Sequence, residues 1–294
     1  MDESETLSDI FDTVQHVADD IYSTISGDLF LYFQAAHFLL VINGVKSSWN
    51  NKVSKEQPFL TWCLSMTCCF GGGVIVKLLS GGKPLAGLND NTSVLLASVI
   101  WWGVFYFPLN LVSNLMKYKS IGCILYLFKE LLRSKKVVKG VTIGLQAYPD
   151  SVLSPIILGV VASCGGSFIK SSSTLFNSQW NSQSIVNYRA SFVTKFCLMF
   201  SFCHVLCAYE FLPVKYFNHD LVALCQAVVL YFVTISKKFD INFDITECIE
   251  PWFCFLFISM PENIILSLAT VFKDSKIEPT KAKSKIKSES KKKR

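Results

Sequence analysis

Apolar residues along this chain gather into long, nearly continuous runs, and most polar residues lie in the short segments between them. A helix needs about 20 mostly apolar residues to cross the hydrocarbon core of a bilayer, within a range of about 17–25. Residues 93–113 form the clearest run because they contain no charged side chain. Seven runs predict seven membrane-spanning helices, at about residues 29–45, 58–79, 92–113, 120–140, 151–171, 187–209 and 220–236.

Lysines between the runs predict the orientation in the membrane, because loops facing the cytosol carry more Lys and Arg than the opposite loops. The loop after the first run carries Lys46, Lys52 and Lys55, and residues 275–294 are rich in lysine. A basic cluster at the end of the fourth run is an exception. Seven spans then put the acidic N-terminus in the lumen and the basic C-terminus in the cytosol.

The sequence contains an internal repeat. The second run reads Gly-Gly-Val-Ile-Val-Lys-Leu-Leu-Ser from residue 72, and the fifth reads Gly-Gly-Ser-Phe-Ile-Lys-Ser-Ser-Ser from residue 165. Each segment lies in the middle helix of a three-helix group, and an odd number of spans inverts the second group. The pattern therefore predicts an all-α membrane protein with seven transmembrane helices, as two inverted three-helix repeats plus a seventh helix.

The same pattern divides the chain into six parts. Residues after the seventh run remain apolar but are interrupted by acids and prolines, so we expect them to lie on the membrane or protein. The parts are a luminal N-terminal segment (1–28), the first repeat (29–113), the second repeat (114–209), the seventh transmembrane helix (210–237), a cytosolic membrane-adjacent segment (238–272) and a disordered polybasic tail (273–294).

Three consecutive glycines, Gly71, Gly72 and Gly73, interrupt the second run. Glycine costs roughly 1 kcal/mol relative to alanine inside a helix, so the cluster needs an explanation. One explanation is close helix packing, which small residues permit in membranes. The other is a bend that opens a cavity and turns backbone groups toward it. A matching pair in the fifth run, Gly165 and Gly166, favours the bend.

The fourth run carries two cations, Lys129 and Arg133, one helical turn apart. A charge at bilayer depth costs roughly 2.5–3.5 kcal/mol on insertion scales and usually faces a bundle interior or watery cavity. Two like charges on one face predict an anionic neighbour, and therefore an ion pathway or an acidic-lipid site. The alternative is an internal salt bridge, with Glu130 pairing with Arg133 or Ser134. Other members of this helical stripe are Gly122, Tyr126, Lys136 and Gly140.

Composition and motifs narrow the function classes. The chain is 51% hydrophobic and 17% charged, and its net charge of +6 is concentrated in a tail without interleaved aromatic residues, which argues against nucleic-acid binding. Most of the 11 cysteines lie within the runs and predict apolar packing. Cys203, His204 and Cys207 lack the second cluster that a metal site needs. Without a catalytic motif, we expect no enzyme but a channel, an inverted-repeat secondary transporter or a lipid-binding scaffold.

Several segments resemble the trimeric intracellular cation channels of the endoplasmic and sarcoplasmic reticulum, in an invertebrate, type-B-like form. Lys129-Glu-Leu-Leu-Arg133 is the most specific of them. This chain departs from the family pattern at Lys77 and Asn110, where an acid is common. The other matching segments are Cys69-Phe70-Gly71, Asn91 to Trp101, Pro108-Leu109-Asn110, Leu212-Pro213-Val214 and Phe243 to Glu247.

The resemblance implies a homotrimer with one pore per subunit that conducts monovalent cations, potassium and sodium, as counter-current to calcium release. It also implies a phosphatidylinositol bisphosphate bound in each pore from the cytosolic side, and no catalytic cofactor. By position, Lys129 and Arg133 hold the head group, and both glycine clusters make room for it. Further candidate contacts at the cytosolic rim are Lys117, Asn177 and Gln179.

Overall fold

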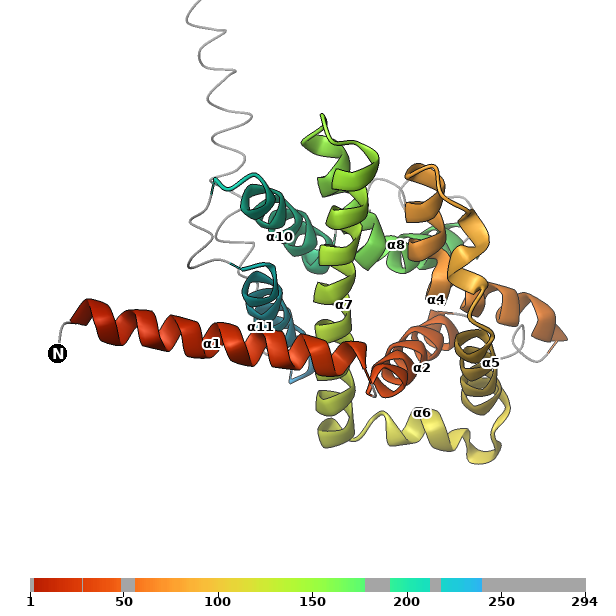
Figure 1. Cartoon of the computed structure of the whole chain (residues 1–294). Helices are drawn as coiled ribbons and strands as arrows, with labels where there is room; N and C mark the ends of the chain where they lie inside the picture. Colours follow the sequence, from red (N-terminus) through yellow and green to blue (C-terminus); the bar gives the residue numbers. More distant parts are fainter. Residues whose placement is uncertain (1–2, 28, 49–55, 178–190, 212–217, 240–294) are drawn as a thin grey trace, which may run out of the picture. The chain divides into compact units, whose positions relative to one another are not determined.

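The computed structural model describes residues 3–27, 29–48, 56–177, 191–211 and 218–239, and every regular element in these ranges is a helix. All of them belong to one compact unit, Met1–Asn242. Figure 1 shows their arrangement. The helices are α1 (Glu3–Ser26), α2 (Phe30–Ser48), α4 (Pro58–Leu79), α5 (Asn91–Tyr106), α6 (Leu111–Leu115), α7 (Lys119–Ala147), α8 (Leu153–Asn177), α10 (Phe192–Ala208) and α11 (His219–Lys238), with 3-10 turns η1 (Pro84–Leu88) and η2 (Pro108–Asn110).

A helix lies at each of the seven predicted runs, although α7 and α8 extend several residues beyond the predicted ends. Among the described residues, three helical segments are long and apolar enough to cross a membrane: Pro58–Leu79, Leu153–Ser172 and His219–Ser236. The bent pair Asp12–Ser26 and Phe30–Ser48 passes the same test when taken together. α5 and α10 are apolar but shorter, and α7 carries many charged residues. The predicted tail, 273–294, and nearly all of the segment before it lie outside the described residues.

The predicted third span, residues 92–113, is wrong at its C-terminal end. α5 stops at Tyr106 because Pro108 disfavours the helical conformation at the residue before it. Phe107 is accordingly extended, with φ −60° and ψ 135°. Asn110 then adopts a left-handed φ of 51°, which asparagine tolerates better than most residues. The chain turns through η2 into the short helix α6 instead of continuing along the α5 axis.

α1 occupies the segment predicted only as a luminal N-terminal stretch. Apolar side chains recur along it at three- and four-residue spacing, and this amphipathic pattern is a helix signal. Its Ala18, Tyr22 and Ile25 are buried. Tyr22 and Ile25 pack with Phe33 of α2 and Ala223 of α11 in one apolar cluster. The N-terminal segment is therefore part of the folded unit.

α7 is central to the packing, with α8, α10, α11 and α2 around it (Figure 1). It packs against α8, α11 and α2, while α8 also packs against α4 and α10. A second apolar cluster joins α2, α4 and α5. Its buried members are Phe38, Ile42, Met66, Cys69, Ala97 and Val104.

The two glycine clusters meet where α4 and α8 cross. A Cβ added to Gly165 would lie 2.5 Å from Gly72 Cα, and one added to Gly72 would lie 3.0 Å from two α8 carbonyl oxygens. A Cβ on Gly166 would collide with the carbonyl of Cys68. Both helices keep their helical assignment through the glycines. Close packing therefore accounts for these three glycines, as small residues allow between membrane helices.

Candidate functional site

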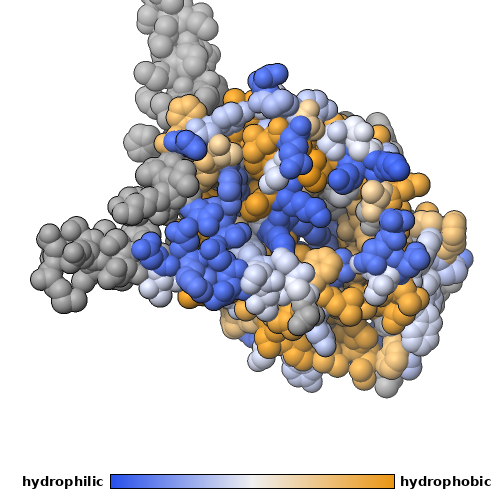
Figure 2. Space-filling model, viewed as in Figure 1, coloured by the Kyte–Doolittle hydropathy of each residue, from blue (hydrophilic) through white to orange (hydrophobic). Residues whose placement is uncertain are grey.

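A cavity of about 520 Å³ lies between α2, α4, α7 and α8. Its walls combine apolar side chains with a concentration of positive charge. The face of the molecule viewed in Figure 2 carries hydrophilic residues at several places among hydrophobic ones. Asp90 is the one acidic residue among the described residues that line it. The cationic lining residues are Lys77, Lys129, Arg133, Lys135, Lys136, Lys139 and Lys170.

Arg133 forms an ion pair with Glu130 one turn earlier on α7. Both side chains are buried, with exposed fractions of 8% for Arg133 and 1% for Glu130. Removing two charges from water is costly, and a close pair with good geometry offsets much of that cost. The internal salt bridge, left open by the sequence, is therefore present and compensates one of the two predicted cations.

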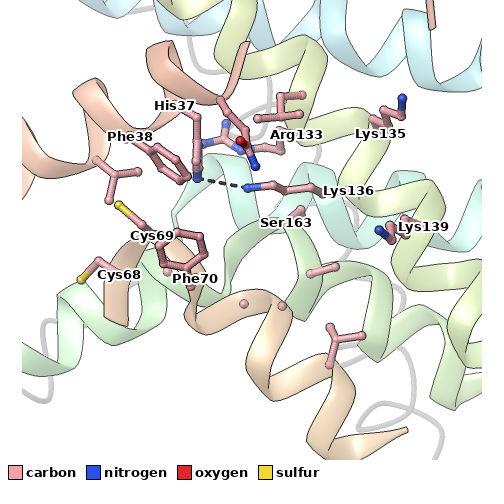
Figure 3. Close-up of a pocket in the computed structure, with 18 of the residues that line it drawn as sticks. His37, Phe38, Cys68, Cys69, Phe70, Arg133, Lys135, Lys136, Lys139 and Ser163 are labelled. Atoms are coloured by element: carbon pink, nitrogen blue, oxygen red, sulfur yellow. Dashed lines mark hydrogen bonds between the residues drawn. The ribbon is translucent and has the colours of Figure 1, made fainter. Parts of the chain in front are cut away.

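Lys136 reaches across the cavity from α7 to α2. Its ammonium lies 3.1 Å from Nε2 of His37, and this contact is drawn in Figure 3. A lysine ammonium can only donate, so the imidazole must accept through Nε2 in its neutral form. The hydrogen bond spans the cavity, and no carboxylate among the described residues forms an ion pair with this lysine.

Lys129 lies two helical turns before Lys136 on the same stripe of α7 and is half-buried. Its Nζ is 5.9 Å from the centre of the Tyr126 ring, and Nζ of Lys238 is 5.5 Å from the same ring. These distances fall within the range of cation–π attraction, which is about 6 Å. Tyr126 therefore has an ammonium group near it from α7 and another from α11.

A second cavity of about 510 Å³ borders the first. Leu40 and Gly44 of α2 line both cavities. Tyr126 and Lys238 line only the second among the described lining residues. The remaining lining residues of the second cavity are Asn43, Ser47, Met116, Gly122, Phe192, Val193, Val233 and Thr234.

The structure brings five of the ten predicted site residues together in one cavity. Lys129 and Arg133 line the first cavity with Gly72, Gly73 and Gly166. Gly73 has open space where its Cβ would lie, so the cavity-opening role predicted for the glycines fits this position. Gly71 faces the Ile169 side chain, and Gly165 faces Gly72, in the helix contact instead.

Of the three predicted rim contacts, Lys117 is the one whose side chain lies within the described residues. Lys117 donates to Asn114 Oδ1 at 3.0 Å and is absent from the described lining of both cavities. Asn177 is the last residue of α8, but its side chain and the whole of Gln179 lie outside the described residues. The sequence reasoning missed Lys170 as a lining residue, although its position in the repeated Gly-Gly segment was a usable signal.

Most of these helices lie in a region of the chain that matches a known protein family. The family model described as TRIC channel matches residues 47–240, about two-thirds of the chain. The chain belongs to the TRIC channel family. α1 and nearly all of α2 precede the matched region. The family consists of ion channels, so the protein is a membrane channel and not an enzyme.

Individual relatives agree with this assignment. The trimeric intracellular cation channel type B of Xenopus tropicalis is 30% identical over 195 residues, covering 66% of this chain and 68% of the relative. Type 1B.2 of Caenorhabditis elegans is 29% identical over 234 residues, covering 78% and 74%. A solved trimeric intracellular cation channel from C. elegans, determined in the absence of Ca²⁺, superposes with a TM-score of 0.66 at 27% identity, covering 80% of this chain and 97% of that one.

Proposed function

We propose that this protein conducts potassium, and sodium, across the membrane of the endoplasmic or sarcoplasmic reticulum, as counter-ion current during calcium release. In this proposal it is a homotrimer, and each subunit binds a phosphatidylinositol bisphosphate head group in the first cavity. Seven of the helices, α2, α4, α5, α7, α8, α10 and α11, span the membrane in this proposal as two inverted three-helix repeats plus a seventh helix, with a luminal N-terminus and a cytosolic C-terminus.

The charge of the cavity carries the lipid proposal. Seven Lys or Arg residues and one acidic residue are among its described lining residues. An empty cavity of this charge would repel the cations that a cation channel conducts. A head group with several phosphates would compensate the excess charge through charge-assisted contacts with Lys129, Arg133 and Lys136. The apolar walls supplied by Phe38 and Phe70 suit the beginning of an acyl chain better than free phosphate.

The contact between Gly72 and Gly165 supports the inverted repeat. These two glycines begin the matching Gly-Gly segments, so they are equivalent positions of the two repeats. Two equivalent residues can touch each other where a two-fold axis passes between them. The neighbouring contacts run in opposite directions along α4 and α8, because Cys68 faces Gly166 and Gly72 faces Ala162. That is the pattern expected for an inverted pair.

Single-channel recording of the purified protein in planar bilayers with asymmetric KCl tests the proposal. We expect cation-selective steps that increase when phosphatidylinositol 4,5-bisphosphate is added, and a weaker lipid response in Lys129→Ala/Lys136→Ala. The matched control is Lys83→Ala, which removes a lysine that lines neither cavity among the described residues. Saturable coupled flux without unitary steps would indicate a secondary transporter. Unitary steps that do not change when the lipid is added would contradict the lipid site but not the channel function.

A further inference from the structure

The two cavities share part of their wall on α2. Leu40 and Gly44, one helical turn apart, are the described residues that line both of them. The first cavity extends from this point toward Lys77 and Asp90 near η1, and the second extends toward Lys238 at the end of α11. Leu40 and Gly44 lie between the two cavities, so an ion that passes directly from one to the other crosses here, and we call this place the neck.

A cationic side chain from another helix occupies the neck. Lys170 projects from α8, and its Nζ lies 2.9 Å from the position that a Cβ on Gly44 would take. An ammonium at that distance fits only because residue 44 is glycine. Lys170 also lines the first cavity, so the same amine faces the space that ends at the neck. The pairing of a glycine with a lysine across two helices thus puts one positive charge at the junction.

We propose that Lys170, held over Gly44, is the residue that limits cation passage between the two cavities. This role rests on the cation conduction proposed above. A fixed ammonium repels a passing monovalent cation, and the repulsion is stronger in a narrow protein-walled space than in bulk water. The same charge attracts chloride, so it also lowers the preference for cations over anions.

Lys170 and Lys77 are equivalent residues of the two repeats, but they lie in different surroundings. Each follows the first glycine of its Gly-Gly pair by five residues and lines the first cavity. Lys77 lies near the η1 turn, where its side chain contacts Gly82, while Lys170 lies at the neck. The repeat therefore supplies two lysines, and only the second is placed to act on ions moving between the cavities.

Single-channel recording of Lys170→Met tests this role. Methionine keeps an unbranched side chain and removes the charge. We expect the unitary potassium conductance to rise roughly twofold or more and the permeability ratio of potassium to chloride to rise with it. Lys170→Arg keeps the charge and should retain the wild-type selectivity. Lys83→Met, a charge removal outside both cavities, is the matched control and should change neither quantity.

Gly44→Ala provides a second variant that keeps every charge. Its methyl group would displace only the flexible end of Lys170, so we expect a folded protein with an altered conductance. Unchanged conductance and selectivity in Lys170→Met, with wild-type current present, would overturn the role of Lys170 and leave channel function standing. If the wild type conducts no current and Lys170→Met does, the role of Lys170 is supported. Silence in both would overturn conduction and this role together.

Discussion

The hydroxyl of Tyr22 in α1 lies 2.6 Å from the hydroxyl of Ser134 in α7, and both residues are buried. Ser134 Oγ also lies 2.9 Å from the carbonyl oxygen of Leu131, to which it donates. The Tyr22 hydroxyl is then left to donate to Ser134. Ser134 directly follows Arg133, so α1 is hydrogen-bonded to the helix turn that carries the cavity cations, although α1 lies outside the family match.

We predict that Tyr22→Phe destabilises the folded protein by about 1 kcal/mol, the typical contribution of one hydrogen bond. The phenyl ring keeps the apolar packing against Ile25 and Phe33, so the loss isolates the hydroxyl. Thermal unfolding in detergent, followed by circular dichroism, measures the effect. Tyr32→Phe is the control because Tyr32 is 63% exposed. Equal unfolding temperatures for the two variants would contradict the buried hydrogen bond.

The glycines offer a matched pair of substitutions. We predict that Gly165→Ala weakens the fold strongly, because its methyl group would meet the Gly72 backbone, which cannot move aside as a side chain can. Gly73→Ala should be neutral or slightly stabilising, since nothing lies within 4 Å of its Cβ position and alanine favours helices by roughly 1 kcal/mol. Yield of folded protein and unfolding temperature both report the difference. Similar losses in the two variants would mean that the crossing of α4 and α8 does not need Gly165.

The long helices were predictable because each long apolar run favours a helix, whichever other helices pack against it. The break after Tyr106 was visible in Pro108, yet the run continued to look apolar beyond it. α1 was overlooked because its apolar residues alternate with charges and never form a run. Periodicity, rather than mean hydropathy, was the signal for that helix.

The site was predictable in part. Position on one stripe of α7 was enough to group Lys129 and Arg133, because helical geometry alone fixes that relationship. The partner of Arg133 could not be chosen from spacing, since both Glu130 and a bound anion were consistent with it. The contacts of His37 with Lys136 and of Gly44 with Lys170 join helices far apart in the sequence. Such contacts depend on how the helices pack, which no local pattern records.

Lys46 caps the C-terminal end of α5. Its ammonium donates to the carbonyl of Val104 at 2.6 Å and to Asn110 Oδ1 at 2.8 Å. We predict that Lys46→Met destabilises the protein by about 1–3 kcal/mol, because a partly buried carbonyl loses its partner. Asn110→Asp should be tolerated or slightly stabilising, since a carboxylate can accept from the same ammonium. Unfolding temperatures of both variants test this, and a stable Lys46→Met protein would contradict the capping role.

The Glu130–Arg133 pair gives the last prediction. Breaking a buried ion pair by removing one partner costs about 3–5 kcal/mol, because the remaining charge stays buried without compensation. We therefore expect Glu130→Gln to lower the unfolding temperature sharply. The double variant Glu130→Gln/Arg133→Gln should recover much of the loss, because it leaves no unpaired charge.

The same variants distinguish a structural ion pair from one that works beside an anionic ligand. If a phosphoinositide head group lies in the cavity, it supplies negative charge to Arg133 when Glu130 is gone. Adding phosphatidylinositol 4,5-bisphosphate should then raise the unfolding temperature of Glu130→Gln more than that of the wild type, and phosphatidylcholine should not. The double variant should show the smallest response because Arg133 is absent. Equal lipid responses in all three proteins would mean that Arg133 does not face the head group and serves only to pair with Glu130.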